Sequence, residues 1–215
     1  MSPTSPGPAT ASVNFGVADD RDEIARAELY GLLAALFYAP MTDELHVGFR
    51  TAVTVAPVEG AFLERSWSDL VAVARRIGLA EARDEYAGLF LGIGKPEVFL
   101  YGSYYLAGTL NQQPLVALRH DLRGLGLERS QEVGETEDHI AALCEVMRYL
   151  IAGDDVGTSH LAAQRRFFDA HLRGWVESLC ATIAGHPAAD LYAAAARFAG
   201  DFFAVEMQGF DLLDA

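Results

Sequence analysis

The 215-residue chain contains few cysteines and no long apolar run. Its two cysteines, Cys144 and Cys180, each lie inside an apolar helical pattern, which predicts small buried side chains and excludes a disulfide framework or a cysteine zinc site. No apolar run is long enough to span a bilayer, so we expect no stable membrane insertion. The first residues lack a basic region followed by an apolar run, which argues against a secretory signal and for a cytoplasmic protein.

Basic residues are also scarce. The chain has 16 lysines and arginines against 30 aspartates and glutamates, and its formal net charge is −14. A surface of this sign repels phosphates, so nucleic acids and anionic membranes are excluded as partners. The same charge permits a basic partner.

Alternating strand patterns are almost absent, whereas apolar residues recur at helical spacing along most of the chain. We therefore predict an all-α protein, a single helical-bundle domain of about eight to ten helices. Residues 1–15, rich in Pro, Ser, Thr and Ala, are expected to form a disordered tail. The helical domain, residues 16–215, divides into an N-terminal half (about 16–91), a connecting loop (about 92–113) and a C-terminal half (about 114–215).

The connecting loop is unusually aromatic. Glycines and a proline interrupt the helical rhythm over residues 92–105, while Phe99, Tyr101, Tyr104 and Tyr105 crowd together. A loop with so many aromatic side chains is not expected to be fully exposed to water, so we expect it to pack between helices or to line a cleft.

A helix is predicted from residue 134 to residue 153. Thr136 is the expected N-cap, and Glu137 and Asp138 fall in the first turn, where carboxylates meet the positive end of the helix dipole. Two interpretations stay open. Either this is a well-capped core helix, or Glu137, Asp138 and His139 form a polar rim beside a groove.

Catalytic motifs are mostly missing. Gly92, Gly94 and Lys95 superficially suggest a phosphate loop, but the glycine spacing fails, and Pro96 stands where a Ser or Thr would hold magnesium. The chain has no Glu-x-x-His pair for a di-iron bundle, no HExxH and no Gly-x-Ser-x-Gly elbow. We therefore expect no enzymatic activity, no cofactor and no metal site.

Three passages in order resemble the TorD/DmsD family of cytoplasmic redox-enzyme maturation chaperones, which is related to the NarJ group. The first is EYAGLF at residues 85–90 followed by YGSYYL at 101–106. The second is EDHI at 137–140 with EVM at 145–147, and the third is FFDAHLRGW at 167–175. The chain departs from the family pattern before the Asp-His pair and around Gly102, where client choice would be set.

The resemblance implies a chaperone for the catalytic subunit of a molybdenum-cofactor oxidoreductase. Such a protein binds the apo form and its twin-arginine signal peptide, assists cofactor insertion and delays export until folding is complete. Weak guanine-nucleotide binding and a monomer or domain-swapped dimer are further implied properties. The alternatives are a helical nucleotide- or metal-dependent enzyme and a structural subunit of a respiratory complex.

The resemblance also places candidate residues for client and signal-peptide binding in the aromatic passages and at the start of the 134–153 helix: Tyr86, Phe90, Tyr101, Ser103, Tyr104, Tyr105, Glu137, Asp138 and His139. We hypothesise that Asp138 contacts the client and that His139 orients the acidic connector of residues 124–135. Packing is the competing role for Tyr86 and Phe90.

Overall fold

The computed structural model describes residues 20–54, 62–92, 95–110, 113–129, 134–153 and 159–214, so the predicted tail lies outside the described residues. The regular elements are helices: α1 (Asp20–Tyr38), α2 (Asp43–Thr51), α3 (Glu64–Arg76), α4 (Leu79–Tyr86), the π-helical turn η1 (Ala87–Leu91), α5 (Gly102–Ala107), α6 (Gln113–Gly124), α7 (Ile140–Ala152), α8 (Leu161–His171), α9 (Val176–Ala184), α10 (Leu191–Asp211) and the 3₁₀ turn η2 (Leu212–Asp214). This confirms the all-α prediction and the expected helix number.

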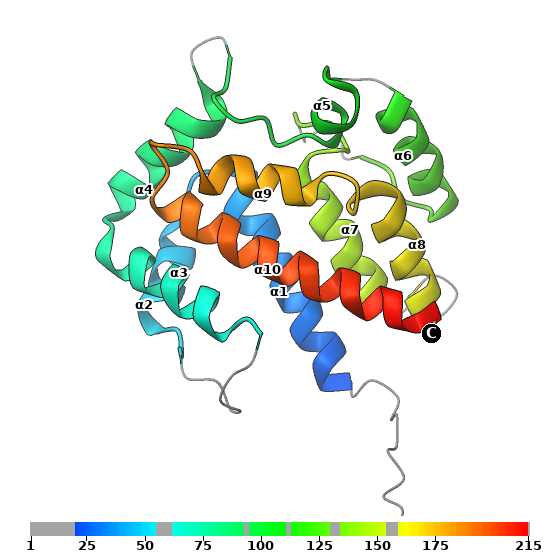
Figure 1. Ribbon diagram of the computed structural model, residues 1–215, viewed down its shortest axis with the longest axis horizontal. Coiled ribbons are helices and arrows are strands. Elements are labelled where there is room, and N and C mark those ends of the chain that lie inside the picture. The colour runs from blue at the N-terminus through cyan, green and yellow to red at the C-terminus, as the bar shows by residue number, and fades with distance from the viewer. Residues whose placement is uncertain are drawn as a thin grey trace, which may run out of the picture.

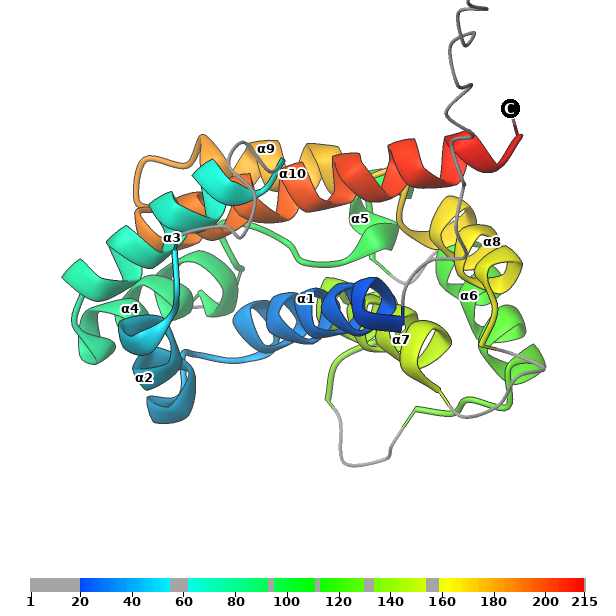
Figure 2. The ribbon, with the colours of Figure 1, turned by 90° about the horizontal axis from the view of Figure 1, so that it is seen from below.

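The helices form two packed layers with smaller groups at both ends. Helices α1 and α7 lie side by side in one layer, and α9 and α10 lie in the other (Figures 1 and 2). Helices α2, α3 and α4 gather at one end, and α5, α6 and α8 at the opposite end (Figure 2). Because α1 packs on α7 and α3 packs on α10, the two halves of the chain form a single unit.

Helix α10 provides most of the central core. It is the longest of the described helices, and its buried side chains include Phe198, Phe202 and Phe203. The ring of Tyr30, on α1, meets the Phe202 ring edge-on with centroids 4.9 Å apart. Edge-to-face aromatic pairs add to the free energy gained by burial, so this contact helps to join the two layers.

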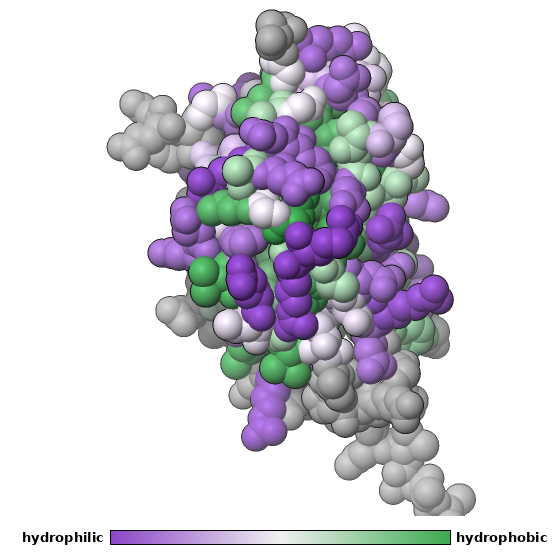
Figure 3. Space-filling view, turned by 90° about the vertical axis from the view of Figure 1, so that its left-hand side faces the viewer, coloured by the Kyte–Doolittle hydropathy of each residue, from purple (hydrophilic) through white to green (hydrophobic). Residues whose placement is uncertain are grey.

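The end of the molecule formed by α2, α3 and α4 presents mainly hydrophilic residues, with hydrophobic ones interspersed (Figure 3). Exposed Val47, Val53 and Phe62 belong to this scattered set. Single exposed apolar side chains are normal on a folded surface, so they indicate no particular function. Among the described residues, none of the helices is long and apolar enough to cross a membrane.

The aromatic connecting loop contains a short helix, α5, and packs between other helices as predicted. Gly102 begins α5 against the buried ring of Trp175, where an added Cβ would lie 3.1 Å from the ring atoms. Tyr105 stacks on the same ring with centroids 5.6 Å apart. The Trp175 indole Nε1 donates to the carbonyl oxygen of His171 at 2.7 Å, which fixes the ring in place.

Helix α7 begins later than the sequence predicts. Its N-cap is His139, whose Nδ1 accepts from the Ala141 amide at 3.2 Å, so the prediction of Thr136 as the cap is wrong. Glu137 and Asp138 therefore precede the helix. The physical reason is a short antiparallel pairing between residues 100–102 and residues 138–140, in which the Gly102 amide donates to the Asp138 carbonyl at 2.9 Å. These bonds hold His139 in an extended conformation immediately before the helix.

Candidate functional site

A groove of about 630 Å³ lies between α1, α7 and the residues that precede α7. We call residues 134–139 the entry segment and this hollow the α1–α7 groove. Its apolar lining is made largely of small side chains that face each other from the two helices: Gly31, Ala34 and Ala35 from α1, and Ala141 and Ala142 from α7. Small residues on both sides let the helix backbones form a shallow floor, and larger apolar groups border it: Tyr38, Leu122, Leu127, Val146 and Tyr149.

The polar border of the groove is mainly acidic. Four carboxylates line it: Glu128 after α6, Glu135 and Glu137 in the entry segment, and Glu145 on α7. Two arginines, Arg129 and Arg148, also line it. A concave apolar surface bordered by carboxylates raises the local concentration of cationic ligands, because the low-dielectric wall focuses the field.

Glu137 is held by an arginine from α6. The Arg119 guanidinium binds it in a bidentate manner, with Nε and Nη2 donating at 3.0 and 2.9 Å. Partial burial raises the pKa of Glu137, but hydrogen bonds from Arg119 and from the backbone outweigh burial and leave that pKa below its usual value. Glu137 is therefore ionised at neutral pH.

Asp138 and His139 lie behind the groove border. The Asp138 side chain is buried, and its two oxygens accept from the Ser103 amide at 2.9 Å and from the Thr136 hydroxyl at 2.6 Å. Burial lowers the pKa of His139 to about 4, although Glu135 and Asp138 oppose the shift. A neutral His139 caps α7 and lines the inner wall of the groove. Asp138 is placed to fix the entry segment, and its direct contact with a client stays a prediction.

Tyr101 connects the aromatic loop to the groove border. Its hydroxyl donates to the Glu135 carboxylate, and its ring meets the His139 ring edge-on with centroids 5.1 Å apart. Burial, followed by the hydrogen bond and charge of Glu135, raises the pKa of Tyr101 above its usual range, so the hydroxyl keeps its proton. The structure thus brings Tyr101 into contact with Glu135 and His139, and client binding by these candidate residues stays a prediction.

The other predicted residues lie elsewhere. Tyr104 and Tyr105 pack on each other, and Tyr105 stacks on Trp175, away from the groove lining. Ser103 is buried, and its hydroxyl has no hydrogen-bond partner among the described residues.

Tyr86 and Phe90 belong to a buried aromatic cluster with Tyr192. The Tyr86 hydroxyl donates to the carbonyl oxygen of Phe37 at 3.1 Å, so the polar end of the ring is satisfied inside the protein. This environment favours the packing role for Tyr86 and Phe90.

The groove lining on α1 was not identified from the sequence. Ala27, Gly31 and Ala35 recur at every fourth position, a spacing that places small residues in one stripe along a helix. That stripe was the available signal. Glu145 and Arg148 were missed as lining residues too, although both lie on the helix singled out from its pattern.

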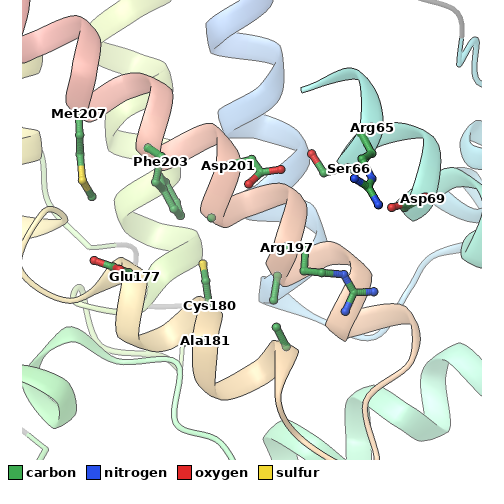
Figure 4. Close-up of a pocket in the computed structure, with 14 residues that line it drawn as sticks. Arg65, Ser66, Asp69, Glu177, Cys180, Ala181, Arg197, Asp201, Phe203 and Met207 are labelled. Carbon is green, nitrogen blue, oxygen red and sulfur yellow. The ribbon is translucent and has the colours of Figure 1, made fainter. Parts of the chain in front are cut away.

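A second groove, of about 730 Å³, lies between α9, α10 and the beginning of α3 (Figure 4). Its charged residues are of both signs: Arg65 and Asp69 on α3, Glu177 on α9, and Arg197 and Asp201 on α10. Three acids against two bases give this border a smaller excess of negative charge than the four carboxylates against two arginines of the α1–α7 groove. The α1–α7 groove, with an excess of carboxylates, is therefore the better candidate for binding a basic partner.

Two other kinds of site find no support in the described part of the chain. It contains no cluster of three or more histidine, cysteine or acidic side chains placed to hold a metal ion. Lys95 of the supposed phosphate loop lies over the Phe99 ring, 5.7 Å from its centroid. Gly92 adopts a positive φ of 48°, and a Cβ there would collide with the carbonyl oxygen of Lys95. These contacts make a tight turn.

Comparisons with known proteins give consistent results. Residues 59–181 match the family model described as nitrate reductase delta subunit. A chaperone protein TorD from Vibrio cholerae serotype O1 is 28% identical over 190 residues, covering 81% of this chain and 86% of that protein. TorD from another strain of the same serotype is 27% identical over the same length. The crystal structure of a protein described as a redox enzyme maturation protein, from Archaeoglobus fulgidus, shares the fold. Its TM-score is 0.57 at 17% identity, covering 91% of this chain and 99% of that one.

Proposed function

The chain belongs to the nitrate reductase delta subunit family, and we propose that it binds the twin-arginine signal peptide of a redox enzyme in the α1–α7 groove. At the coarser level it is a chaperone of redox-enzyme maturation and not an enzyme, as the TorD relatives are named. To this chaperone function the proposal adds three points: the ligand is a twin-arginine signal peptide, it binds in the α1–α7 groove, and carboxylates and apolar side chains recognise it.

One observation carries the proposal: the groove combines an apolar floor with an acidic border. A twin-arginine signal peptide combines paired guanidinium groups with an apolar segment. Guanidinium groups bind carboxylates through two parallel hydrogen bonds, and an apolar segment binds a helix-lined groove. Both halves of the peptide thus find a matching surface within one hollow.

The charge of the groove border favours a peptide over a phosphate-bearing ligand, whereas the size of the groove suits either. Its volume of about 630 Å³ is within the range of sites that hold several side chains or a drug-sized molecule. The four carboxylates repel phosphate groups, which argues against this groove as a nucleotide site. The weak guanine-nucleotide binding implied by the family resemblance stays a prediction for another part of the surface.

A titration tests the proposal. The ligand is a synthetic peptide with two adjacent arginines followed by an apolar segment, and the measured quantity is its dissociation constant by calorimetry. A charge-assisted hydrogen bond contributes roughly 1.5–3 kcal/mol, so Glu137→Gln should weaken binding about ten- to a hundred-fold. Glu145 is half exposed, so Glu145→Gln should weaken binding by about fivefold at most.

The matched control is Glu44→Gln, which removes the same charge from an exposed position on α2. It should bind as the unaltered protein does, because its distance in the fold leaves only a screened, long-range effect. Equal affinities for all four proteins would overturn the assignment of the groove. A peptide with both arginines replaced by glutamine should lose affinity by at least the same factor.

The client and the consequences of binding form the second part of the proposal. The apo form of a molybdenum-cofactor oxidoreductase is held while its cofactor is inserted, and export is delayed until folding is complete. Pull-down of the tagged chain from cells grown under anaerobic respiration, followed by mass spectrometry, should recover a molybdenum-enzyme precursor that keeps its signal peptide. The same experiment with Glu137→Gln should recover less of it. Recovery of the chain within the mature exported enzyme would instead favour a structural subunit.

A further inference from the structure

Arg148 crosses from α7 to α1 and lies directly on Gly31. A Cβ added to Gly31 would be 3.3 Å from Cδ and 3.4 Å from Nε of Arg148, which places the arginine side chain against the α1 backbone. An alanine at this position would require the Arg148 side chain to withdraw by a few tenths of an ångström. The contact therefore depends on one glycine in the small-residue stripe of α1.

The same two residues separate two hollows. Gly31 and Arg148 line the α1–α7 groove, and both also line an adjoining hollow of about 370 Å³. The remaining lining of that second hollow is Ile24, Ala27, Glu28 and Ala152. The Arg148 side chain thus forms a partition between two parts of one continuous furrow along α1 and α7.

The partition is weakly held. Arg148 Nη1 donates to the Glu145 carboxylate at 3.3 and 3.4 Å, and both side chains are 53% exposed. Exposed pairs three residues apart on one helix change an equilibrium by roughly fivefold at most. By contrast, Glu145 can bind an incoming guanidinium in a bidentate manner once Arg148 has left it.

We propose that Arg148 is a displaceable cover: an arginine of the bound peptide replaces it at Glu145, and its departure from Gly31 joins the two hollows into one channel. This inference rests on the proposed function and adds the orientation of the ligand. The basic residues lie at the acidic border, and the apolar segment runs over Gly31 toward Ala27 and the exposed side chain of Ile24.

The test uses the full-length protein and two peptides, both with paired arginines, one with a long apolar segment and one with a segment half that length. Arg148→Ala removes the cover, so the long peptide should bind about three- to fivefold more tightly. Both peptides profit from the freed Glu145, but the short peptide does not reach beyond Gly31, so its gain should be at most half that of the long peptide. Arg50→Ala, at an exposed position on α2, is the control for the change in net charge and should leave both affinities unchanged.

A second variant tests the channel from its far end. Ala152 is exposed and lines the second hollow, so Ala152→Trp should fill it and weaken only the long peptide, by about fivefold or more. In one outcome the unaltered protein binds both peptides, while Arg148→Ala binds each of them no more tightly than Arg50→Ala does. That result refutes the cover and leaves the proposed function standing. If the unaltered protein binds neither peptide, both proposals are overturned.

Discussion

Helix α1 has a closed side and an open side. On the closed side it is tied to α10, because Arg26 binds Glu206 and the Tyr30 hydroxyl donates to the same carboxylate at 3.0 Å. On the open side it presents Gly31 and Ala35 to the α1–α7 groove. One helix therefore fixes the two layers to each other with one surface and lines the α1–α7 groove with the other.

Two ion pairs of almost identical geometry can be compared: one joins α1 to α10 on the closed side, and the other lies at the border of the α1–α7 groove on the open side. Arg26 binds Glu206 with both N···O distances at 2.8 Å, and Arg119 binds Glu137 at 3.0 and 2.9 Å. Their burial differs, since Arg26 and Glu206 are 21% and 5% exposed whereas Arg119 and Glu137 are 46% and 14% exposed. Burial decides the role of each pair, because breaking a buried pair leaves an uncompensated charge and breaking an exposed pair does not.

Removal of the Glu206 carboxylate should produce the largest change in stability. Glu206→Ala leaves the Arg26 guanidinium and the buried Tyr30 hydroxyl without this acceptor, and the free energy of unfolding should fall by about 3 kcal/mol. That value is at the low end of the range for buried pairs, because Arg26 also donates to Glu23 and Gln164. Urea denaturation followed by circular dichroism measures the change.

The corresponding substitution on the open side is the control. Glu137→Ala removes a carboxylate of the same geometry whose partner, Arg119, is half exposed and regains water, so stability should change by about 1 kcal/mol. Similar losses in the two variants would refute the distinction between the closed and open sides. The peptide affinities should show the reverse order, with Glu206→Ala close to the unaltered protein and Glu137→Ala weakened.

The second largest expected effect is a loss of stability at low pH, which His139 causes. The folded protein keeps the pKa of His139 at about 4, whereas an unfolded histidine titrates near 6.5, chiefly because burial disfavours the imidazolium. Stability from this group is complete above pH 6.5 and is lost as the pH falls toward 4, since the unfolded chain binds the proton first. The loss should amount to about 2–3 kcal/mol.

His139→Asn isolates that contribution. Asparagine also accepts from a backbone amide at an N-cap, so the start of α7 should be retained. The unfolding free energies of the two proteins should therefore approach each other by about 2–3 kcal/mol between pH 6.5 and pH 4. Parallel pH profiles would show that His139 does not titrate in this window.

The sequence predicted the fold well because helical periodicity is a local signal. Cys144, Cys180 and Trp175 are buried, as their positions in apolar patterns indicated. The beginning of α7 was misplaced because its determinant is not local. Thr136 is a good cap by residue type, but pairing of residues 138–140 with residues 100–102 holds His139 extended, so the helix begins only after it. A contact between segments about 38 residues apart leaves no trace in a helical pattern.

The candidate site was predicted only at its edge. Glu137 and His139 do line the groove, but Asp138 next to them lies behind it, with both side-chain oxygens bonded inside the protein. Motif residues that stand out chemically thus serve largely to position the entry segment. The floor consists of glycine and alanine, whose small side chains carry no chemical signature and become meaningful only when two helices face each other.

A third prediction concerns Gly102, the first residue of α5, which lies against the fixed ring of Trp175. Gly102→Ala places a methyl group 3.1 Å from the Trp175 ring, which is buried and held by its hydrogen bond to His171. The ring cannot move aside, so overpacking should lower the free energy of unfolding by about 1–2 kcal/mol. A thermal melt that is unchanged would show that α5 shifts to accommodate the methyl group.

Gly31→Ala is the smallest of the expected effects, and its sign is opposite. The added methyl group meets Cδ of Arg148 at 3.3 Å, but that side chain is flexible and about half exposed, so it can withdraw by a few tenths of an ångström. Replacing glycine by alanine inside α1 then raises the free energy of unfolding by about 0.5–1 kcal/mol, because the unfolded chain loses conformational freedom. Substitution by alanine should therefore lower the free energy of unfolding at Gly102, which lies against the Trp175 ring, and raise it at Gly31, which lies against the Arg148 guanidinium. Destabilisation by Gly31→Ala, measured in the same denaturation experiment, would mean that Arg148 is held as firmly as Trp175 and would contradict its role as a displaceable cover.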